Sequence, residues 1–299
     1  MKKYFILIAT IQIIISQSFS NFSFLGSKSM GMAGAVVSNI NDTETIFYNP
    51  SGLVNVDKYS IIIGNSNLYN LNFLNHQFIG LSLSNNIALS FQQLSTDSKG
   101  SFSQSSNSVQ LSSEEVVSVS QGFRLLDDAN STLSVGYSLN ALIFNQAASA
   151  GPNGDGTFGL SASSSTSVGI DVGINASLRD KIIFGAFIKN INNPSLKKGS
   201  SQSHFPRRMD LGITYNPFQD LHTTFAFSRS LGQDKTSFKF GVEYNLTEFF
   251  TLRSGIQMNP NRLGFGLNYS IKNIDLSYSL LTHSILSTSN VLSIGVNFE

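Results

Sequence analysis

Apolar and polar side chains alternate along much of the chain, most clearly in its second half. In residues 236–246, 262–271 and 274–280, every second residue is Phe, Leu, Ile, Val or Tyr, and the residues between them are small, polar or charged. Residues 168–178 and 292–298 show the same pattern. Because successive side chains of a strand point to opposite faces of a sheet, each segment predicts a β-strand with one apolar and one polar face.

The whole chain carries about 14 such segments of about 10 residues, the length that a tilted strand needs to cross a membrane. The other segments lie near 59–67, 76–84, 86–95, 114–124, 133–139, 181–190, 207–215, 221–229 and 249–258. Long connections at 96–113, 145–165 and 191–206 follow the third, fifth and seventh strands, whereas connections after even-numbered strands are short. Outer-membrane barrels have short periplasmic turns and longer outer loops, so this arrangement favours a meander with an even strand number.

A soluble two-sheet sandwich would also alternate, because its apolar faces pack against each other. Such a protein exposes many Lys and Glu side chains, but here charged residues make up only 12% of 299 residues. The mean hydropathy of +0.04 is too low for a bundle of membrane helices. A closed sheet pairs every backbone group, as hydrocarbon requires. We therefore expect an all-β fold, a transmembrane up-and-down antiparallel β-barrel with lipid outside and small polar side chains inside.

Composition also excludes several kinds of chemistry. The chain has no cysteine, which excludes disulfide scaffolds, thiolate metal sites and thiol nucleophiles. Its formal net charge is only +1, so we expect no nucleic-acid partner. The histidines, His76, His204, His222 and His283, show no metal-site spacing, and no nucleophile-elbow motif is present. We predict no catalytic residue, no bound metal and no cofactor, and we do not expect an enzyme.

The N-terminus has the features of a cleavable export signal. Lys2 and Lys3 precede a short apolar run at residues 5–15, and Ser18 and Ser20 supply small residues for a cleavage site. The alternative, a membrane-anchoring helix, needs about 20 apolar residues. We therefore predict export and residence in the bacterial outer membrane through strands.

Residues 26–53 break the alternation and are rich in small residues. Asp42, followed by a Thr and a Glu, predicts the start of a helix with the Asp42 side chain as its cap. Pro50 prevents Asn49 from continuing a helix and predicts a turn there. The segment is therefore expected to be compact and conformationally specified.

This segment resembles the opening of the PorV/PorQ-type outer-membrane barrels, which are related to the FadL-type long-chain fatty acid transporters. The matching residues are Gly26, Met30, Gly31, Met32, Gly34, Ala35, Asp42, Tyr48, Asn49, Pro50, Gly52 and Leu53. Residues 205–217 and 275–298 resemble further landmarks of that family. The chain departs from the family pattern at Lys28, Asn41, Ser51 and Glu299.

The resemblance implies a barrel of 14 strands whose N-terminal segment lies inside as a plug. It divides the chain into a signal peptide at 1–20, a plug segment at 21–58 and a barrel at 59–299. Because the chain is short for a fatty acid transporter, the ligand sites of those proteins are not carried over.

Charged residues on the polar faces are expected to line the lumen. The candidates are Asp171, Arg208, Asp210, Lys239, Glu243, Arg253 and Asp275. Unpaired charge in a confined space is costly, so they either neutralise one another and the plug or form a selectivity lining for a polar solute. The basic pairs at 197–198 and 207–208 either contact lipopolysaccharide phosphates or are solvated.

The resemblance implies a non-enzymatic accessory or shuttle component of protein secretion and surface attachment. Its partners would be outer-membrane lipids and exported proteins or secretion-machinery subunits, engaged by the long outer loops. The alternative is a FadL-like passive channel for hydrophobic small molecules, which predicts a hydrophobic ligand in an apolar lumenal pocket beside 26–53. A third reading is a purely structural barrel.

Overall fold

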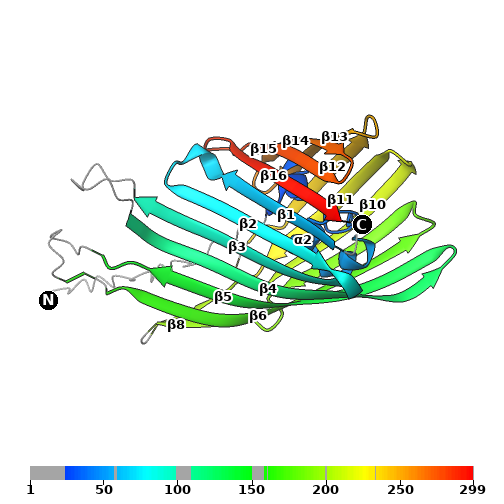
Figure 1. Cartoon of the computed structure of the whole chain (residues 1–299). Helices are drawn as coiled ribbons and strands as arrows, with labels where there is room; N and C mark the ends of the chain where they lie inside the picture. The colour runs from blue at the N-terminus through cyan, green and yellow to red at the C-terminus, as the bar shows by residue number, and fades with distance from the viewer. Residues whose placement is uncertain are drawn as a thin grey trace, which may run out of the picture.

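The computed structural model describes residues 24–56, 59–98, 109–149, 158–159, 161–198, 201–232 and 234–298. Fourteen strands form one closed antiparallel barrel (Figure 1). The barrel closes where β1 (Tyr59–Asn67) pairs with β16 (Ser289–Phe298) as well as with β2 (Leu74–Leu83). The predicted fold class and strand number are confirmed, whereas the predicted signal peptide lies outside the described residues.

The strands follow one another around the barrel in chain order. Between β2 and β16 they are β3 (Ile87–Ser98), β4 (Val109–Asp128), β5 (Ser131–Gln146), β6 (Ser163–Leu178), β7 (Ile182–Lys189), β10 (Arg208–Phe218), β11 (Leu221–Ser230), β12 (Ser237–Asn245), β13 (Phe250–Met258), β14 (Arg262–Ile271) and β15 (Ile274–Leu281). A short 3-10 helix, η2 (Leu68–Asn70), connects β1 to β2, and another, η3 (Ser84–Asn86), connects β2 to β3. We call the end with the connections after β3, β5 and β7 the loop end and the opposite end the turn end.

Three strands are longer than the alternation predicts. β4 has 20 residues, and β5 and β6 have 16 each. β4 begins five residues inside the connection expected at 96–113, whereas β5 and β6 enter the one expected at 145–165 by two and three residues. In the extension of β6, residues 163–167, both faces carry only Ser or Thr, so the apolar pattern ends before the backbone pairing does, whereas the added residues of β5 include Leu142 and Ile143. The connection expected at 191–206 contains a separate hairpin of β8 (Ser195–Lys198) and β9 (Ser201–His204).

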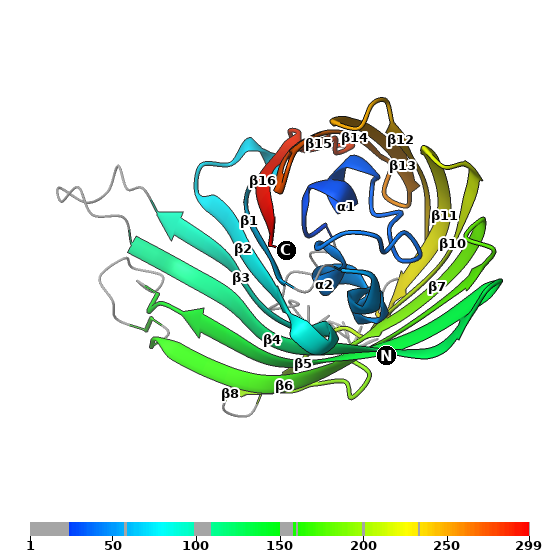
Figure 2. The same ribbon diagram turned by 45° about the vertical axis from the view of Figure 1, so that its right-hand side comes forward.

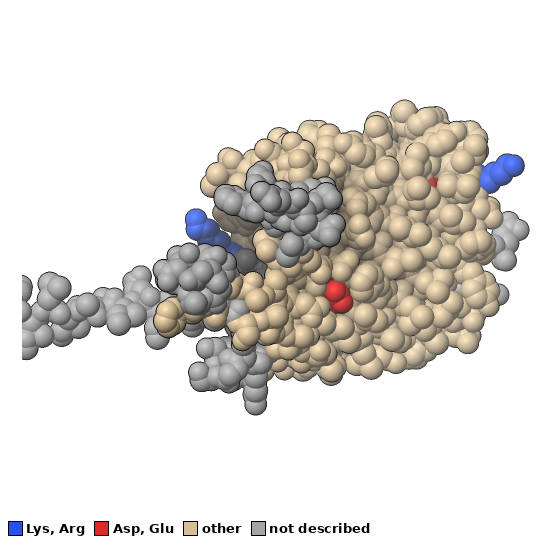
Figure 3. Space-filling view, turned by 60° about the vertical axis from the view of Figure 1, so that its left-hand side comes forward, with Lys and Arg blue, Asp and Glu red and all other residues tan. Residues whose placement is uncertain are grey.

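The apolar face of each strand points outward. On β14, Phe265 and Leu267 are 53% and 54% exposed, whereas Gly264, Gly266 and Asn268 between and beside them are buried. Few charged side chains reach the surface in the space-filling view (Figure 3). An outward apolar band of this kind matches the hydrocarbon of a membrane.

The N-terminal residues 24–56 lie inside the barrel (Figure 2). They contain α1 (Ser27–Gly31), α2 (Thr45–Tyr48) and the 3-10 helix η1 (Pro50–Asn55), and we call this segment the plug. No helix in the described part of the chain has the length and apolar character needed to cross a membrane.

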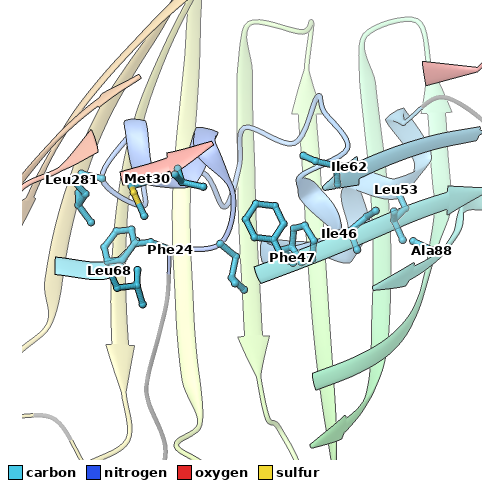
Figure 4. Packing of buried hydrophobic residues seen from close by; sticks show 13 residues of the cluster. Phe24, Met30, Ile46, Phe47, Leu53, Ile62, Leu68, Ala88 and Leu281 are labelled. Carbon is cyan, nitrogen blue, oxygen red and sulfur yellow. The ribbon is translucent and has the colours of Figure 1, made fainter. Parts of the chain in front are cut away.

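One apolar cluster joins the plug to the inner wall (Figure 4). Phe24, Met30 and Phe47 of the plug pack with wall residues that include Phe78 and Leu281. The rings of Phe47 and Phe78 meet edge to face with centroids 5.3 Å apart, a favourable aromatic geometry. The hydrophobic core of this protein is therefore inside the barrel, between plug and wall.

Candidate functional site: the plugged lumen

Inward-facing glycines form a belt where the plug touches the wall. They are neighbours across strands in three runs: Gly122, Gly136 and Gly173 on β4 to β6; Gly185 and Gly212 on β7 and β10; and Gly241, Gly255 and Gly264 on β12 to β14. Atoms of the plug lie within contact distance of the Cβ position at every one of them. We call this set the glycine belt; it explains why glycine recurs on the polar faces of the strands.

At four positions of the belt, Gly136, Gly185, Gly255 and Gly264, the backbone of the plug occupies the space of a side chain. A Cβ on Gly136 would overlap the Pro50 carbonyl group, and a Cβ on Gly255 would overlap the backbone of Met32. Only glycine permits this approach. The plug is thus fitted directly against the sheet.

Asn49 ties the plug together at the predicted turn. Helix α2 ends at Tyr48, and Asn49 has extended backbone angles, as Pro50 predicts. The Asn49 side-chain nitrogen donates to the carbonyl oxygen of Val37 at 2.7 Å, and its side-chain oxygen accepts from the Ser51 hydroxyl at 2.7 Å. The same nitrogen lies 3.4 Å from the backbone oxygen of Ile174 on β6, which links the turn to the wall.

The other residues of the predicted plug motif are also placed by contacts within the barrel. Met30 and Leu53 are fully buried, and Gly31 packs against Gly266 of β14. Gly26 and Gly34 have φ angles of +88° and +80°, a region that favours glycine. The resemblance therefore pointed to residues that the structure brings together.

Lys28 is the centre of a buried charge cluster. Its Nζ lies 2.6 Å from Asp42 Oδ2 and 3.4 Å from Glu243 Oε1 of β12. Glu243 Oε2 accepts from Arg253 Nε of β13 at 2.7 Å. Side-chain exposure is only 3% for Lys28 and 8% for Glu243 but 25% for Asp42, so two cations and two carboxylates join plug and wall in a largely buried cluster.

The prediction that the Asp42 side chain caps a helix is wrong. Helix α2 begins at Thr45, whose N–H donates to the backbone oxygen of Asp42. The Asp42 carboxylate instead binds Lys28 and accepts from the Tyr48 hydroxyl at 2.8 Å. The Asp42 carboxylate thus pairs with the buried Lys28 cation and not with a free backbone N–H at the start of α2, because hydrogen bonds between charged groups are stronger.

Glu44 closes the plug on itself. Its two carboxylate oxygens accept from the backbone nitrogens of Ser27 and Lys28, each at 2.8 Å. Burial and the nearby Asp42 carboxylate raise the pKa of Glu44 to about 7. Burial lowers the pKa of Lys28, but Asp42 and Glu243 outweigh it and the net shift is upward, so Lys28 stays charged.

The remaining predicted lumen residues also have polar partners on the inner wall. Arg208 donates to Asp210 at 2.8 Å, and Lys239 lies 4.0 Å from the same carboxylate. Asp171 accepts from the Asn190 backbone at 2.7 Å. Asp275 accepts from the side chains of Ser270 and Asn297 at 2.5 and 3.2 Å. Arg208, Asp210 and Lys239 therefore neutralise one another, whereas Asp171 and Asp275 accept hydrogen bonds from neutral groups.

Two cavities lie beside the plug near the turn end. One, of about 300 Å³, is lined by Lys28, Glu44, Arg253 and Asp275 among other polar residues. The other, of about 400 Å³, is lined by Asn55, Arg124 and Asp127, among others. Both are polar, which does not match the apolar pocket that the channel reading predicts.

Sequence reasoning missed the role of Lys28, which we noted only as a departure from the family pattern. The available signal was a lone cation in an otherwise uncharged stretch of small residues, with an acid 14 positions later. Within the described ranges, no group of three His, Cys, Asp or Glu side chains is placed to hold a metal ion.

A closed barrel of 14 strands with an apolar outer face and its own N-terminal segment inside defines a plugged outer-membrane barrel. The family model described as type IX secretion system membrane protein PorP/SprF matches residues 66–295, and the chain belongs to that family. The outer membrane of a Gram-negative bacterium is accordingly its location. The resemblance to PorV/PorQ-type barrels is confirmed only at this coarser level, because the matching family is PorP/SprF.

Solved structures with the same fold include two toluene transporters and a FadL homologue. The Pseudomonas putida toluene transporter TodX is 13% identical, with 93% of this chain and 99% of that chain covered and a TM-score of 0.58. The Ralstonia pickettii toluene transporter TbuX is 13% identical, with 93% and 100% covered and a TM-score of 0.55.

A Pseudomonas aeruginosa FadL homologue is 12% identical, with 92% and 98% covered and a TM-score of 0.50. At these identities the likeness shows the fold alone. No curated protein matches the chain. The family and these three structures are described as secretion or transport proteins, and none as an enzyme.

Proposed function

We propose that this protein is an accessory barrel of type IX secretion that holds an exported protein or a secretion subunit at the cell surface. The observation that carries this proposal is the fit between the plug and the glycine belt. Where the backbone of the plug at Met32 and Pro50 fills the side-chain space of the wall, no polypeptide can pass between plug and wall. Membership of the PorP/SprF family supports a role in secretion. The partner therefore has to meet the outside of the barrel or its loop end.

The loop-end parts of β3 to β6 offer a surface for that partner. Figure 1 shows β4, β5 and β6 running well past the strands on the other side of the barrel. Near this end the outward row changes from apolar to polar. Its polar members are Asn75, Gln93, Asp97, Glu115 and Asn145; Ser95 and Ser113 lie between them but are buried. They bind one another: Gln93 donates to Glu115 at 3.2 Å and Asn75 donates to Asp97 at 2.9 Å.

A polar outward row marks the place where the hydrocarbon ends. Between this row and the loop end, the strands are surrounded by water. We call this projecting part of β4 to β6 the outer panel. Leu111 lies on the panel and is 46% exposed, an apolar side chain beyond the membrane that a protein partner would cover.

Site-specific photocrosslinking tests this proposal. A photoreactive phenylalanine analogue replaces Leu111 on the outer panel in the full chain, expressed in cells with an active type IX system. The matched control carries the same analogue at Ala129, which is exposed at the turn end. We expect a covalent product with an exported protein or secretion subunit from position 111 only. Equal products from both positions, or none from 111, would contradict the proposal.

The alternative function is a passive channel for hydrophobic small molecules, supported by the likeness to the toluene transporters. The polar linings of the cavities beside Lys28 and Asn55 speak against it. Uptake of a labelled fatty acid into liposomes that contain the full chain measures it directly. Uptake above that of empty liposomes would favour the channel. With neither uptake nor crosslinking, the purely structural barrel would stand.

A further inference from the structure

The outward face of β6, β7, β10 and β11 carries an apolar groove of about 390 Å³. Two small residues, Ala176 and Ala186, stand there among large ones. One row across the four strands runs through Ile174, Ala186, Leu211 and Phe227. The missing side-chain volume at Ala186 therefore leaves a notch between bulky neighbours, in a surface that faces acyl chains.

Two arginines lie on the same face toward the loop end. Arg229 is the next outward residue after Phe227 on β11, about 7 Å further along the strand, and it pairs with Met209 of β10. Arg207 precedes Met209 on the outward row, and its backbone oxygen accepts from Leu231 at 2.7 Å. Both arginines are exposed, and neither forms an ion pair with any residue that the structure describes.

The position of these arginines relative to the membrane follows from the outward row of β10. That row begins with Arg207, continues through three apolar residues and ends with Tyr215, which is 52% exposed. Eight residues span about 26 Å along the strand, which is about 20 Å along the membrane normal at a tilt of about 40°, so the row from Arg207 to Tyr215 covers most of the roughly 25 Å apolar band of an outer-membrane barrel. Arg207 and Arg229 therefore lie at the loop-end boundary of the hydrocarbon, at the depth of lipid phosphates.

We propose that this wall binds lipid A of the outer leaflet, with an acyl chain in the groove and a phosphate held by Arg207 and Arg229. The planar guanidinium presents paired N–H groups that match phosphate oxygens, and the groove matches an aliphatic chain. The charge is local to this side: the outward residues near the loop end of β3 and β4 include Asp97 and Glu115, which repel phosphate. This inference is independent of the proposed role in secretion.

Binding of diphosphorylated lipid A to the full chain in detergent, followed by native mass spectrometry, tests the charged half of the site. The double variant Arg207→Gln/Arg229→Gln should lose roughly ten- to a hundredfold in affinity, because two charge-assisted contacts are removed. The control, Arg179→Gln/Lys272→Gln, removes two exposed cations at the turn end and should bind as the wild type does. Equal loss in both variants would indicate general charge attraction and overturn the proposal.

A separate variant tests the apolar groove of the site. If one of the two variants fails to fold, the other still tests the proposal. Ala186→Phe fills the notch and should weaken lipid A binding, whereas Ala141→Phe on the outward face of β5 should not. Inorganic phosphate should compete poorly, since it has no acyl chain. Unchanged binding in both Ala186→Phe and the double arginine variant, or full competition by inorganic phosphate, would refute the site. A protein occupying the groove in place of lipid would refute it as well.

Discussion

The plug and the wall are specified in different ways. In the wall, backbone pairing repeats from strand to strand, and many outward side chains differ only in which apolar residue they are. In the plug, regular structure is limited to α1, α2 and η1, and single residues such as Lys28 and Asn49 make contacts that no neighbour duplicates. A repeating structure tolerates a changed member, whereas a structure held by individual contacts does not. Substitutions where the two meet should therefore have the largest effects.

The largest effect is expected at Glu243, which pairs with Lys28 and Arg253. Replacing it by Gln leaves two buried cations without the acid they share, a loss of about 3–5 kcal/mol. The measurement is urea unfolding followed by heat-modifiable gel mobility. The control, Asp127→Asn, breaks an exposed ion pair with Arg124 and should cost at most about 1 kcal/mol. Similar losses in both variants would mean that the buried cluster does not fix the plug.

A smaller effect is expected in the glycine belt. Gly255→Ala places a methyl group against the Met32 backbone, and overpacking of this kind costs about 1–3 kcal/mol. Gly295→Ala is the matched control on β16, where the nearest atom, the Cβ of Asp275, is 3.4 Å from the new Cβ. The control should keep or slightly raise the free energy of unfolding, because alanine restricts the unfolded chain. Equal destabilisation by both changes would show that contact with the plug is not the cause.

The smallest effect is a dependence of plug stability on pH. The pKa of Glu44 is raised from its ordinary value of 4.5 to about 7, so the neutral form is favoured in the folded plug. Its stabilising contribution is complete below pH 4.5 and is lost as the pH rises through 7. Protease resistance of residues 24–56 should fall between pH 5 and 8. In Glu44→Gln that decline should flatten, and an unchanged profile would assign it to another group.

The wall was largely predictable because the two faces of each strand meet different solvents. The alternation on β12 to β16 follows from that difference alone. It failed on the extension of β6, where both faces are polar and only the backbone hydrogen bonds continue the strand. Alternation of apolar and polar residues appears only where the two faces of a strand meet different environments. It disappears where both faces meet the same environment.

The plug was predictable only where a residue dictates its own backbone. Pro50 determines the conformation of Asn49 without help from the rest of the fold, and that prediction is confirmed. The Asp42 prediction failed because its partner, Lys28, is 14 residues away in sequence and becomes close only when the plug folds. The cluster around Glu243 joins residues more than 200 positions apart, and no local pattern indicates such a contact.

The glycine belt also bears on biogenesis. Inward-facing glycines contribute no side chains to the interior of the barrel. Without the plug, that space would be filled by water. We therefore expect the plug to be enclosed before β1 and β16 pair between Tyr59 and Phe298 and close the barrel. Membrane insertion of the barrel and enclosure of its plug are then expected to be coupled.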